Sequence, residues 1–261
     1  QQYIERPLLV GGFKFDLRVY ILVVGGSSQN LSTSPPSIFL CREGMARFCT
    51  EQYTEPTGDN LHKCMGHLTN YSLNKRSDNF QHGGTDMASV LDPASTASKR
   101  PLTAVLQQLE AEQAGFNRDS FYASLADLVG TSVAAMIPVL ASVYCDQIST
   151  AGGVEEMRCF QILGFDIILK RDFSPSLLEV NNSPSLCIDE VLPIRPDEPL
   201  PEGTKPCLCM EMSGPHWHQT ALVDLHIKKA AMAGAFRLLE QLTEGVEEPS
   251  DDVYIPVDII D

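Results

Sequence analysis

The segment Gly164–Asn181, which reads GFDIILKRDFSPSLLEVN, is the part of this sequence that says most about the fold. It contains two mainly apolar runs, 165–169 and 177–181, on either side of a polar stretch at 170–175. Short apolar runs that flank a turn are typical of a β-hairpin packed against a core. The sequence therefore predicts two antiparallel strands in this segment.

Three polar side chains interrupt these runs: Asp166 in the first, and Glu179 and Asn181 in the second. Side chains alternate between the faces of a strand, so Glu179 and Asn181 share a face, and an antiparallel partner can place Asp166 beside them. Such oxygen groups are costly to bury unless a cation neutralises them, and they suit Mg²⁺. The alternative is a hairpin whose polar residues face water, which is the better interpretation of Asp166 taken alone.

A second hairpin is predicted in the first third of the chain. Residues 13–21 alternate between apolar and polar side chains, which is the pattern of a half-buried strand. The polar set consists of Lys14, Asp16, Arg18 and Tyr20. A row of alternating charges is often a solvated face, so this strand alone leaves its function open. A second apolar run at 38–41 precedes Arg42 and Arg47, and arginine suits bidentate binding of carboxylate or phosphate.

Length and charge limit the classes of function. The chain has 261 residues, of which 43% are hydrophobic and 20% charged, as in an ordinary globular protein. Residues 1–80 hold 8 Lys and Arg against 7 Asp and Glu, and residues 81–261 hold 11 against 27, so balances of +1 and −16 give the net charge of −15. This excess of acid argues against nucleic acid as a partner, and an anionic substrate should approach the first third.

Apolar runs and cysteines bear on the compartment. No uninterrupted apolar run approaches the roughly 18 residues of a membrane span, because Pro138 interrupts the longest, at 133–145. We therefore expect no membrane partner. We expect no secretory signal in the first residues, QQYIERP. The eight cysteines lack framework spacing, which predicts reduced thiols in the cytosol.

Two cysteines and two histidines near the end of the chain could in principle bind Zn²⁺. They are Cys207, Cys209, His216 and His218. Their spacing is not that of a common zinc module, and prolines at 206 and 215 favour a plain loop over a metal site.

Five segments of the chain occur in an order that is specific when taken together. They are YIERPLLVGGFKFDLRVYILV at 3–23, REGMARFCTEQY at 42–53, NLHKCMGHLTNYSLNK at 60–75, CFQILGFDIIL at 159–169 and LLEVNNSPSL at 177–186. Together they resemble the tubulin-tyrosine-ligase-like family of ATP-grasp enzymes, most closely its polyglutamylase branch. The resemblance implies an α/β, ATP-grasp-like fold in which helices flank a mixed or antiparallel sheet.

The resemblance also implies which residues bind ATP. They are the adenine hinge Gln2, Tyr3 and Ile4, the nucleotide contacts Lys14 and Asp16, and the pair Thr69 and Asn70 near the ribose and acceptor.

The same resemblance implies the catalytic and metal residues. Arg18 matches an arginine that faces the reacting phosphate and the acceptor carboxylate, and Arg47 matches one that orients an amino-acid or tail carboxylate. Asp166, Glu179 and Asn181 match the Mg²⁺ ligands, in agreement with the strand argument above.

The implied activity is an ATP- and Mg²⁺-dependent ligase that adds glutamate to glutamate side chains of tubulin tails through an acyl phosphate. Its expected partners are the C-terminal tails of tubulin, or microtubules, and free glutamate. The expected location is the cytoplasm and cytoskeleton, including the axoneme or basal body of a cilium or flagellum. The alternatives are a glycylase or tyrosine ligase of the same family, or a catalytically silent axonemal subunit that binds tubulin.

The chain divides into an expected core and three further segments. They are the family core at 1–190 with a mobile loop at 81–99, a Pro- and acid-rich loop at 191–217, a helix at 218–243 and an acidic tail at 244–261. The apolar stripe expected on that helix consists of Leu225, Met232, Phe236 and Leu239. The family's Gly-rich phosphate loop has no counterpart before the hinge, so we expect the C-terminal part of a longer catalytic core.

Overall fold

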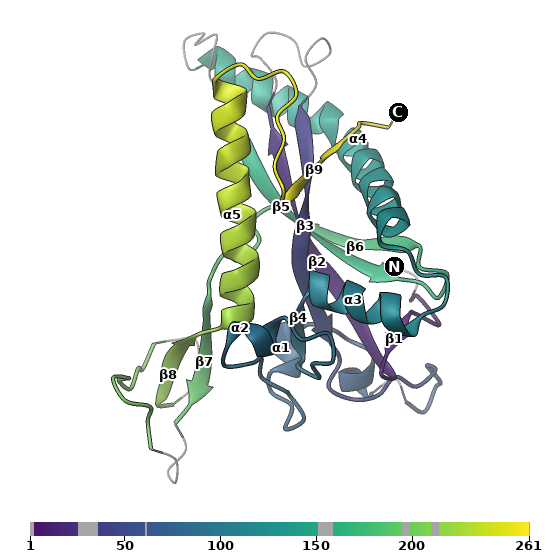
Figure 1. Cartoon of the computed structure of the whole chain (residues 1–261), viewed down its shortest axis with the longest axis vertical. Coiled ribbons are helices and arrows are strands. Elements are labelled where there is room, and N and C mark those ends of the chain that lie inside the picture. The colour runs from purple at the N-terminus through teal and green to yellow at the C-terminus, as the bar shows by residue number, and fades with distance from the viewer. Residues whose placement is uncertain are drawn as a thin grey trace.

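The computed structural model describes residues 3–25, 36–60, 62–150, 159–194, 199–209 and 214–260. Its centre is a seven-stranded antiparallel sheet with the main path β4-β3-β2-β5-β6 (Figure 1). Strand β1 also pairs with β2, and β9 pairs with β3. The strands are β1 Leu9–Val10, β2 Phe13–Val24, β3 Ser37–Phe48, β4 Lys99–Pro101, β5 Phe160–Leu169, β6 Pro175–Asn181 and β9 Tyr254–Val257.

Both hairpins predicted from the sequence are present. Strands β2 and β3 pair so that Asp16 lies opposite Arg47, and β5 pairs with β6 so that Asp166 lies opposite Glu179. A bulge follows directly after Asp166. Because β2 lies between β3 and β5, it also sets Arg18 opposite Asp166. The register of three central strands thus gathers the polar residues that the sequence placed on separate strands.

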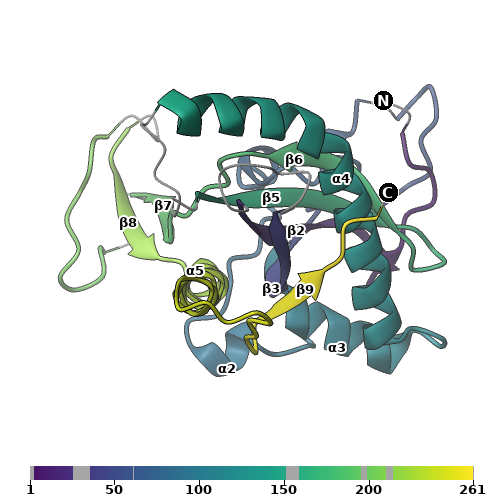
Figure 2. The same cartoon turned by 90° about the horizontal axis from the view of Figure 1, so that it is seen from above.

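Helices cover both faces of this sheet. They are α1 Tyr71–Asn74, α2 Met87–Val90, α3 Leu102–Glu112, α4 Arg118–Thr150 and α5 Leu222–Thr243, with a short 3₁₀ turn at Cys64–Gly66. Seen from above, α5 lies on one side of β3 and β9, and α3 and α4 lie on the other (Figure 2). One face of β2 packs in the same core cluster as α3 and α4, and its opposite face packs with α5 through Tyr20, Leu22 and Val24. The expectation of a half-buried β2 was therefore wrong, because α5 covers the second face.

Helix α5 begins at Leu222, so residues 218–220 of the helix expected at 218–243 belong to a strand instead. The predicted apolar stripe is correct only in part, because Met232 and Leu239 pack against the core. Phe236, expected inside, is 57% exposed. The buried apolar side chains are those of Val223, Ile227, Ala231, Ala235, Leu238 and Leu242. A Cβ on Gly234 would lie 2.9 Å from the ring of Tyr254. Small residues at 231, 234 and 235 let the helix approach the sheet closely, so part of the buried face carries no large apolar side chain.

The acidic segment at 244–261 was expected to be a tail, but it contributes a strand to the main sheet. Strand β9 pairs with Ile38–Cys41 of β3. The ring of Tyr254 is buried, and its hydroxyl donates a hydrogen bond of 3.0 Å to the carbonyl of Ala231 in α5. The acidic composition of this segment concealed a short strand-forming run, YIPV.

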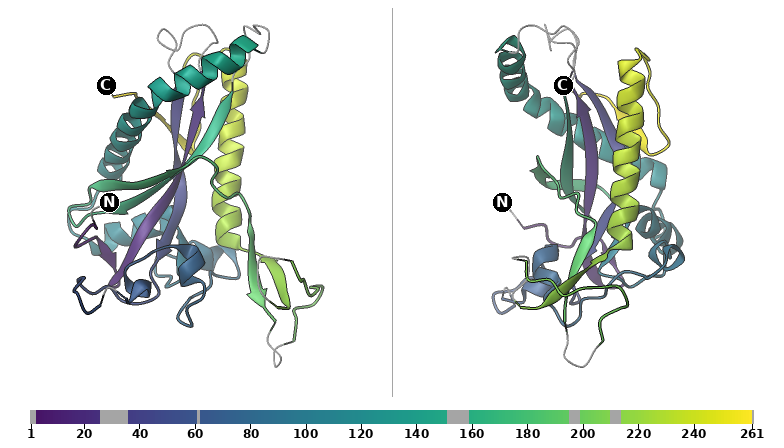
Figure 3. Two further views of the ribbon diagram at one scale, coloured as in Figure 1. Left: turned by 180° about the vertical axis from the view of Figure 1, so that it is seen from behind. Right: turned by 90° about the vertical axis from the view of Figure 1, so that its left-hand side faces the viewer.

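The segment at 191–217 was expected to be a loop, yet strands occupy its two ends. Strand β7, Asp189–Pro193, pairs antiparallel with β8, His216–Thr220, in a separate two-stranded sheet. This hairpin projects away from the main sheet (Figure 3). Its prolines and acidic residues lie mainly in the connection, so average composition gave no sign of the strands.

The expected mobile loop at 81–99 contains α2, which has reciprocal capping bonds. The backbone N–H of Ser89 donates to the Asp86 carboxylate at 2.9 Å, and the Ser89 side chain returns to the Asp86 backbone. Val90, Ala97 and Ser98 are buried. Mobility of this segment stays a prediction, but part of its chain is packed.

One helix among the described residues is long and apolar enough, by length and composition alone, to cross a membrane. This helix is the part Arg118–Leu140 of α4. An 18-residue stretch of it has a mean hydropathy of 1.7, and 22% of that stretch is buried. Counting only uninterrupted apolar residues missed it. Core helices of soluble proteins meet the same criterion, and Leu125, Val129 and Val133 pack in the main core. The expected absence of a membrane partner stays a prediction.

Candidate functional site

A cavity of about 300 Å³ opens beside the polar end of β2. Nine of the predicted site residues line it: Tyr3, Ile4, Lys14, Asp16, Arg47, Thr69, Asn70, Asp166 and Glu179. Arg18 adjoins the cavity through Asp166, and Asn181 through Glu179. Gln2 lies outside the described residues. The predicted residues thus come together, although they derive from four strands and two loops.

Asp166 on β5 is the centre of the cluster. Arg18 donates to both of its carboxylate oxygens, with an Nη2–Oδ2 distance of 2.8 Å, and Arg47 Nη2 lies 2.8 Å from Oδ2. Burial alone would raise the pKa of the Asp166 carboxyl, but the hydrogen bond from Arg18 and the charge of Arg47 outweigh it, so the pKa is lowered. Asp166 is therefore an anion at neutral pH.

Asp16 on β2 holds the other side of Arg47. The guanidinium of Arg47 makes a bidentate pair with Asp16, with both N–O distances 2.7 Å, and the Thr69 hydroxyl donates to Asp16 Oδ2 at 2.6 Å. Burial acts to lower the pKa of Arg47, but Asp16 and Asp166 raise it more. Arg47 therefore links two buried carboxylates. Its expected contact with a substrate carboxylate stays a prediction.

Glu179 and Asn181 form the solvent-facing edge of the site. The Asn181 amide nitrogen donates to Glu179 Oε1 at 3.2 Å. Glu179 is exposed and lies opposite Asp166 in the β5–β6 register, so both side chains share one face of the sheet. The bulge after Asp166 increases the local twist at this point.

The donor set fits Mg²⁺. Two carboxylates and an amide are hard oxygen donors of the kind that this ion binds. A carboxylate offers about four acceptor positions, so the three arginine bonds leave Asp166 with capacity for a metal. Glu179, which is open to solvent, would supply the second carboxylate.

Lys14 is fixed against the predicted adenine hinge. Its ammonium group donates to the Tyr3 hydroxyl at 3.1 Å and to the His67 carbonyl at 2.7 Å, and lies 4.3 Å from the centre of the Tyr3 ring. Burial lowers the pKa of Lys14. The close packing of Tyr3 and Lys14 places the hinge beside a buried cation.

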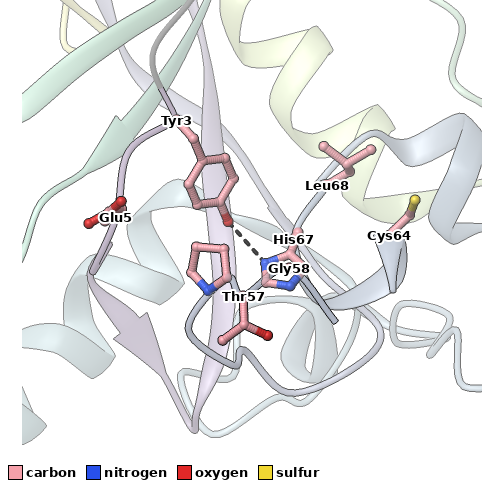
Figure 4. Close-up of a pocket in the computed structure, with 8 residues that line it drawn as sticks. Tyr3, Glu5, Thr57, Gly58, Cys64, His67 and Leu68 are labelled. Carbon is pink, nitrogen blue, oxygen red and sulfur yellow. Dashed lines mark hydrogen bonds between the residues drawn. The ribbon is translucent and has the colours of Figure 1, made fainter. Parts of the chain in front are cut away.

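A second cavity, of about 460 Å³, adjoins the first through Tyr3, His67 and Leu68, which line both. Figure 4 shows the Tyr3 hydroxyl directed at the His67 ring, at a distance of 3.1 Å from Nδ1. Because Lys14 donates to this hydroxyl, the hydroxyl proton is free to bond His67 Nδ1. His67 Nε2 is then a buried donor with no protein partner among the described residues.

Four residues, His67, Leu68, Ile168 and Leu178, were not among the site residues predicted from the sequence. All four line the first cavity. Ile168 and Leu178 sit within the apolar runs of the predicted hairpin, where nothing in the pattern separates a cavity wall from core. For His67, its place inside the segment HLTNYSLNK was the only available signal.

Comparison with known proteins agrees with this geometry. Residues 1–193 match the Tubulin-tyrosine ligase family. The chain belongs to this family. It is 35% identical over 255 residues to Tubulin polyglutamylase TTLL11 of Mus musculus, which covers 98% of this chain and 30% of that protein. It is 38% identical over 192 residues to Tubulin polyglutamylase ttll6 of Danio rerio, which covers 74% and 22%.

The chain therefore spans less than a third of the length of these relatives. The resemblance inferred from the sequence is confirmed, including the polyglutamylase relatives. The predicted fold class is confirmed as well, because the sheet is antiparallel and flanked by helices, consistent with this family.

Proposed function

We propose that this chain carries the metal- and acceptor-binding part of a ligase that adds glutamate to glutamate side chains of tubulin tails, with ATP and Mg²⁺. The observation that carries the proposal is the convergence of Asp166, Glu179 and Arg47 on one cavity, with Arg18 bonded to Asp166 beside it. Membership of the family supports it, as do relatives named tubulin polyglutamylases.

The chemistry explains why charge must be concentrated here. A carboxylate is a poor acyl donor, because its leaving group would be an oxide. Transfer of the γ-phosphoryl group of ATP to that carboxylate gives an acyl phosphate and ADP. The amine of the incoming glutamate then attacks the acyl carbon, loses a proton and expels phosphate, forming the isopeptide bond. Phosphoryl transfer depends mainly on positioning and charge stabilisation.

The charges of the described site balance before any ligand binds. Lys14, Arg18 and Arg47 contribute three positive charges, and Asp16, Asp166 and Glu179 contribute three negative charges. A bound nucleotide would make the cavity strongly anionic. A divalent cation held by Asp166, Glu179 and Asn181 would offset that charge and polarise the transferred phosphoryl group.

The residues have distinct proposed tasks. Lys14 and the Tyr3 ring hold the nucleotide side of the cavity, with Thr69 and Asn70 towards the ribose and acceptor. Arg18 is proposed to face the reacting phosphate and the acceptor carboxylate. Arg47 fixes Asp16 and Asp166 and so sets the geometry of the metal edge. We propose the cytoplasm and cytoskeleton as the location, with a cilium or flagellum axoneme or basal body as its specific form.

Glu179→Gln in the full-length protein tests the metal edge. The amide keeps the shape of an exposed side chain and removes the charge, so incorporation of labelled glutamate into tubulin should fall by on the order of 10³-fold while the fold is retained. Glu247→Gln, which removes the same charge from an exposed position outside the cavity, is the matched control. Unchanged incorporation by Glu179→Gln would refute the metal assignment.

The same assay separates the alternatives within the family. Incorporation of labelled glycine or tyrosine in place of glutamate would identify another donor. Tubulin binding without incorporation of any amino acid, together with no MgATP binding, would support a silent subunit.

A further inference from the structure

Two cysteines and two histidines converge beside the projecting hairpin. Cys207 and Cys209 lie on the segment before β8, and His216 and His218 lie on β8 itself. Their potential ligand atoms all lie within 4.8 Å of one another. We propose that these four residues form a structural Zn²⁺ site that closes the hairpin.

This corrects the interpretation of the segment as plain loop. The spacing of these residues in the sequence is not that of a common zinc module because a β-bridge brings the two pairs together. In this bridge, Cys207 and His216 exchange backbone hydrogen bonds of 2.6 and 3.2 Å. Residues two apart on an extended strand point to the same face. Because Cys207 is bridged to His216, and His216 and His218 share one face of β8, the two cysteines and the two histidines come together.

The distances suit a tetrahedral ion. Zinc bonds of about 2.3 Å to sulfur and 2.0–2.1 Å to nitrogen separate the ligand atoms of a tetrahedron by about 3.3–3.8 Å. Cys209 Sγ lies 3.1 Å from His216 Nε2 and 3.5 Å from His218 Nε2. These two separations are close to the tetrahedral values, and no two of the potential ligand atoms lie more than 4.8 Å apart.

Neighbouring groups already select the metal-binding atoms. His216 is fully buried, and its Nδ1–H donates to the Gly214 carbonyl at 2.9 Å, which leaves the lone pair of Nε2 directed towards Cys209. Zinc-bound histidines usually donate their other ring N–H to a carbonyl or carboxylate. The backbone N–H of Cys209 also donates to Cys207 Sγ, at 3.4 Å.

The chemistry of the donors selects zinc over the ion proposed for the main site. Two thiolates and two imidazoles in a tetrahedral arrangement are typical of zinc, whereas Mg²⁺ requires oxygen ligands. Four protein ligands leave no open position, so the ion would be structural and would not activate water.

The hairpin has few other means of support. A two-stranded sheet is only marginally stable by itself. In this hairpin, Leu192 and Trp217, which lie opposite each other, are only half-buried. At its base, Glu190 accepts from Gln219 and lies 3.0 Å from His82 Nδ1. A metal that ties residues 207–209 to β8 would convert binding free energy into folding free energy of the hairpin.

The direct test is metal content. The full chain, purified without added metal, should retain about one zinc ion per chain by plasma mass spectrometry. Cys209→Ser should retain less than about a tenth of that amount, because zinc needs all four ligands. Cys187→Ser, which removes an exposed cysteine outside the cluster, is the control and should retain the zinc of the parent chain.

A second measurement keeps the proposal testable if Cys209→Ser fails to fold. Cobalt added to the stripped parent chain should give visible d–d absorption of a tetrahedral site and sulfur-to-cobalt charge transfer, both lost on addition of zinc. Absence of bound metal and of this spectrum would overturn the proposal. So would another metal in place of zinc, a Cys207–Cys209 disulfide in the purified chain, or equal zinc content in Cys209→Ser and parent.

Discussion

Among the described residues, two clusters of side chains are proposed to bind metal ions, and they are supported in different ways. The cluster around Asp166 rests on β2, β3 and β5, in the middle of the main sheet, and two arginines balance its carboxylates. The cluster around Cys209 rests on a two-stranded hairpin outside that sheet. The first cluster is held in place by the fold before any ion binds. The second is proposed to hold its own part of the fold together.

Removal of Asp166 should have the largest effect on the main sheet. Asp166→Ala leaves Arg18 and Arg47 without their shared buried partner, so the free energy of unfolding should fall by about 3–5 kcal/mol, and ligation should be lost. Denaturant titration measures the change. Asp252→Ala, at an exposed site, should shift stability by less than about 0.5 kcal/mol. Equal shifts in both variants would show that the ion pairs do not support the sheet.

Arg47→Ala separates the nucleotide from the carboxylate substrates. If Arg47 orients a substrate carboxylate, this variant should raise KM for glutamate or for the tail peptide by about 10-fold, or about 1.4 kcal/mol, and raise KM for ATP less. Arg237→Ala, which breaks an ion pair away from the cavity, is the control. A defect confined to ATP would limit Arg47 to holding Asp16 and Asp166.

Chelation should act on the hairpin and leave the sheet intact. Removal of zinc should increase amide hydrogen exchange in β7 and β8 by about 10-fold or more, because a free two-stranded sheet opens readily. Exchange in β2 and β5 should be unchanged, since arginines and buried apolar residues hold those strands. Equal protection of β7 and β8 with and without chelator would remove the distinction between the two clusters.

Acid should loosen the base of the hairpin by a smaller amount. Burial raises the pKa of Glu190, but the hydrogen bonds with His82 and Gln219 lower it more, so its folded pKa is below the unfolded value of about 4.3. This stabilisation is complete above about pH 5 and is lost as pH falls through the folded pKa. In the Glu190→Gln variant, the free energy of unfolding should therefore change less as pH falls below about 5. A curve identical to that of the parent chain would exclude Glu190 as the anchor.

The carboxylates of the candidate site could be predicted from the sequence because they lie in strongly patterned strands, whereas the loop residues Tyr3, Thr69 and Asn70 were implied only by the resemblance to the family. A lone Asp166 or Glu179 inside an apolar run is conspicuous, and the period of two fixes its face. The short connection between β5 and β6 then sets which residues of these two strands lie opposite each other. His67 escaped this reasoning because it lies in an irregular segment, where no periodicity indicates which way a side chain points.

The parts that could not be predicted depend on contacts between distant segments. Ala231 and Ala235 are buried only because the sheet approaches α5 closely, and Tyr254 joins the fold by pairing with residues over 200 positions earlier. The Cys and His pairs meet through a bridge between irregular and extended chain. None of these contacts has a local period, so spacing did not predict them, although the Cys and His pairs were recognised in the sequence as a set that could bind Zn²⁺.

Strand β9 has a consequence for the order in which the chain folds. Residues 38–41 of β3 are made early, but their outer edge is paired only when Tyr254–Val257 arrives. Until then, a ribosome-bound or truncated chain presents unpaired backbone N–H and C=O groups on an apolar strand, which is a template for pairing with other chains. Pairing of the segment 254–257 with β3 therefore covers an edge that would otherwise be open to such contacts.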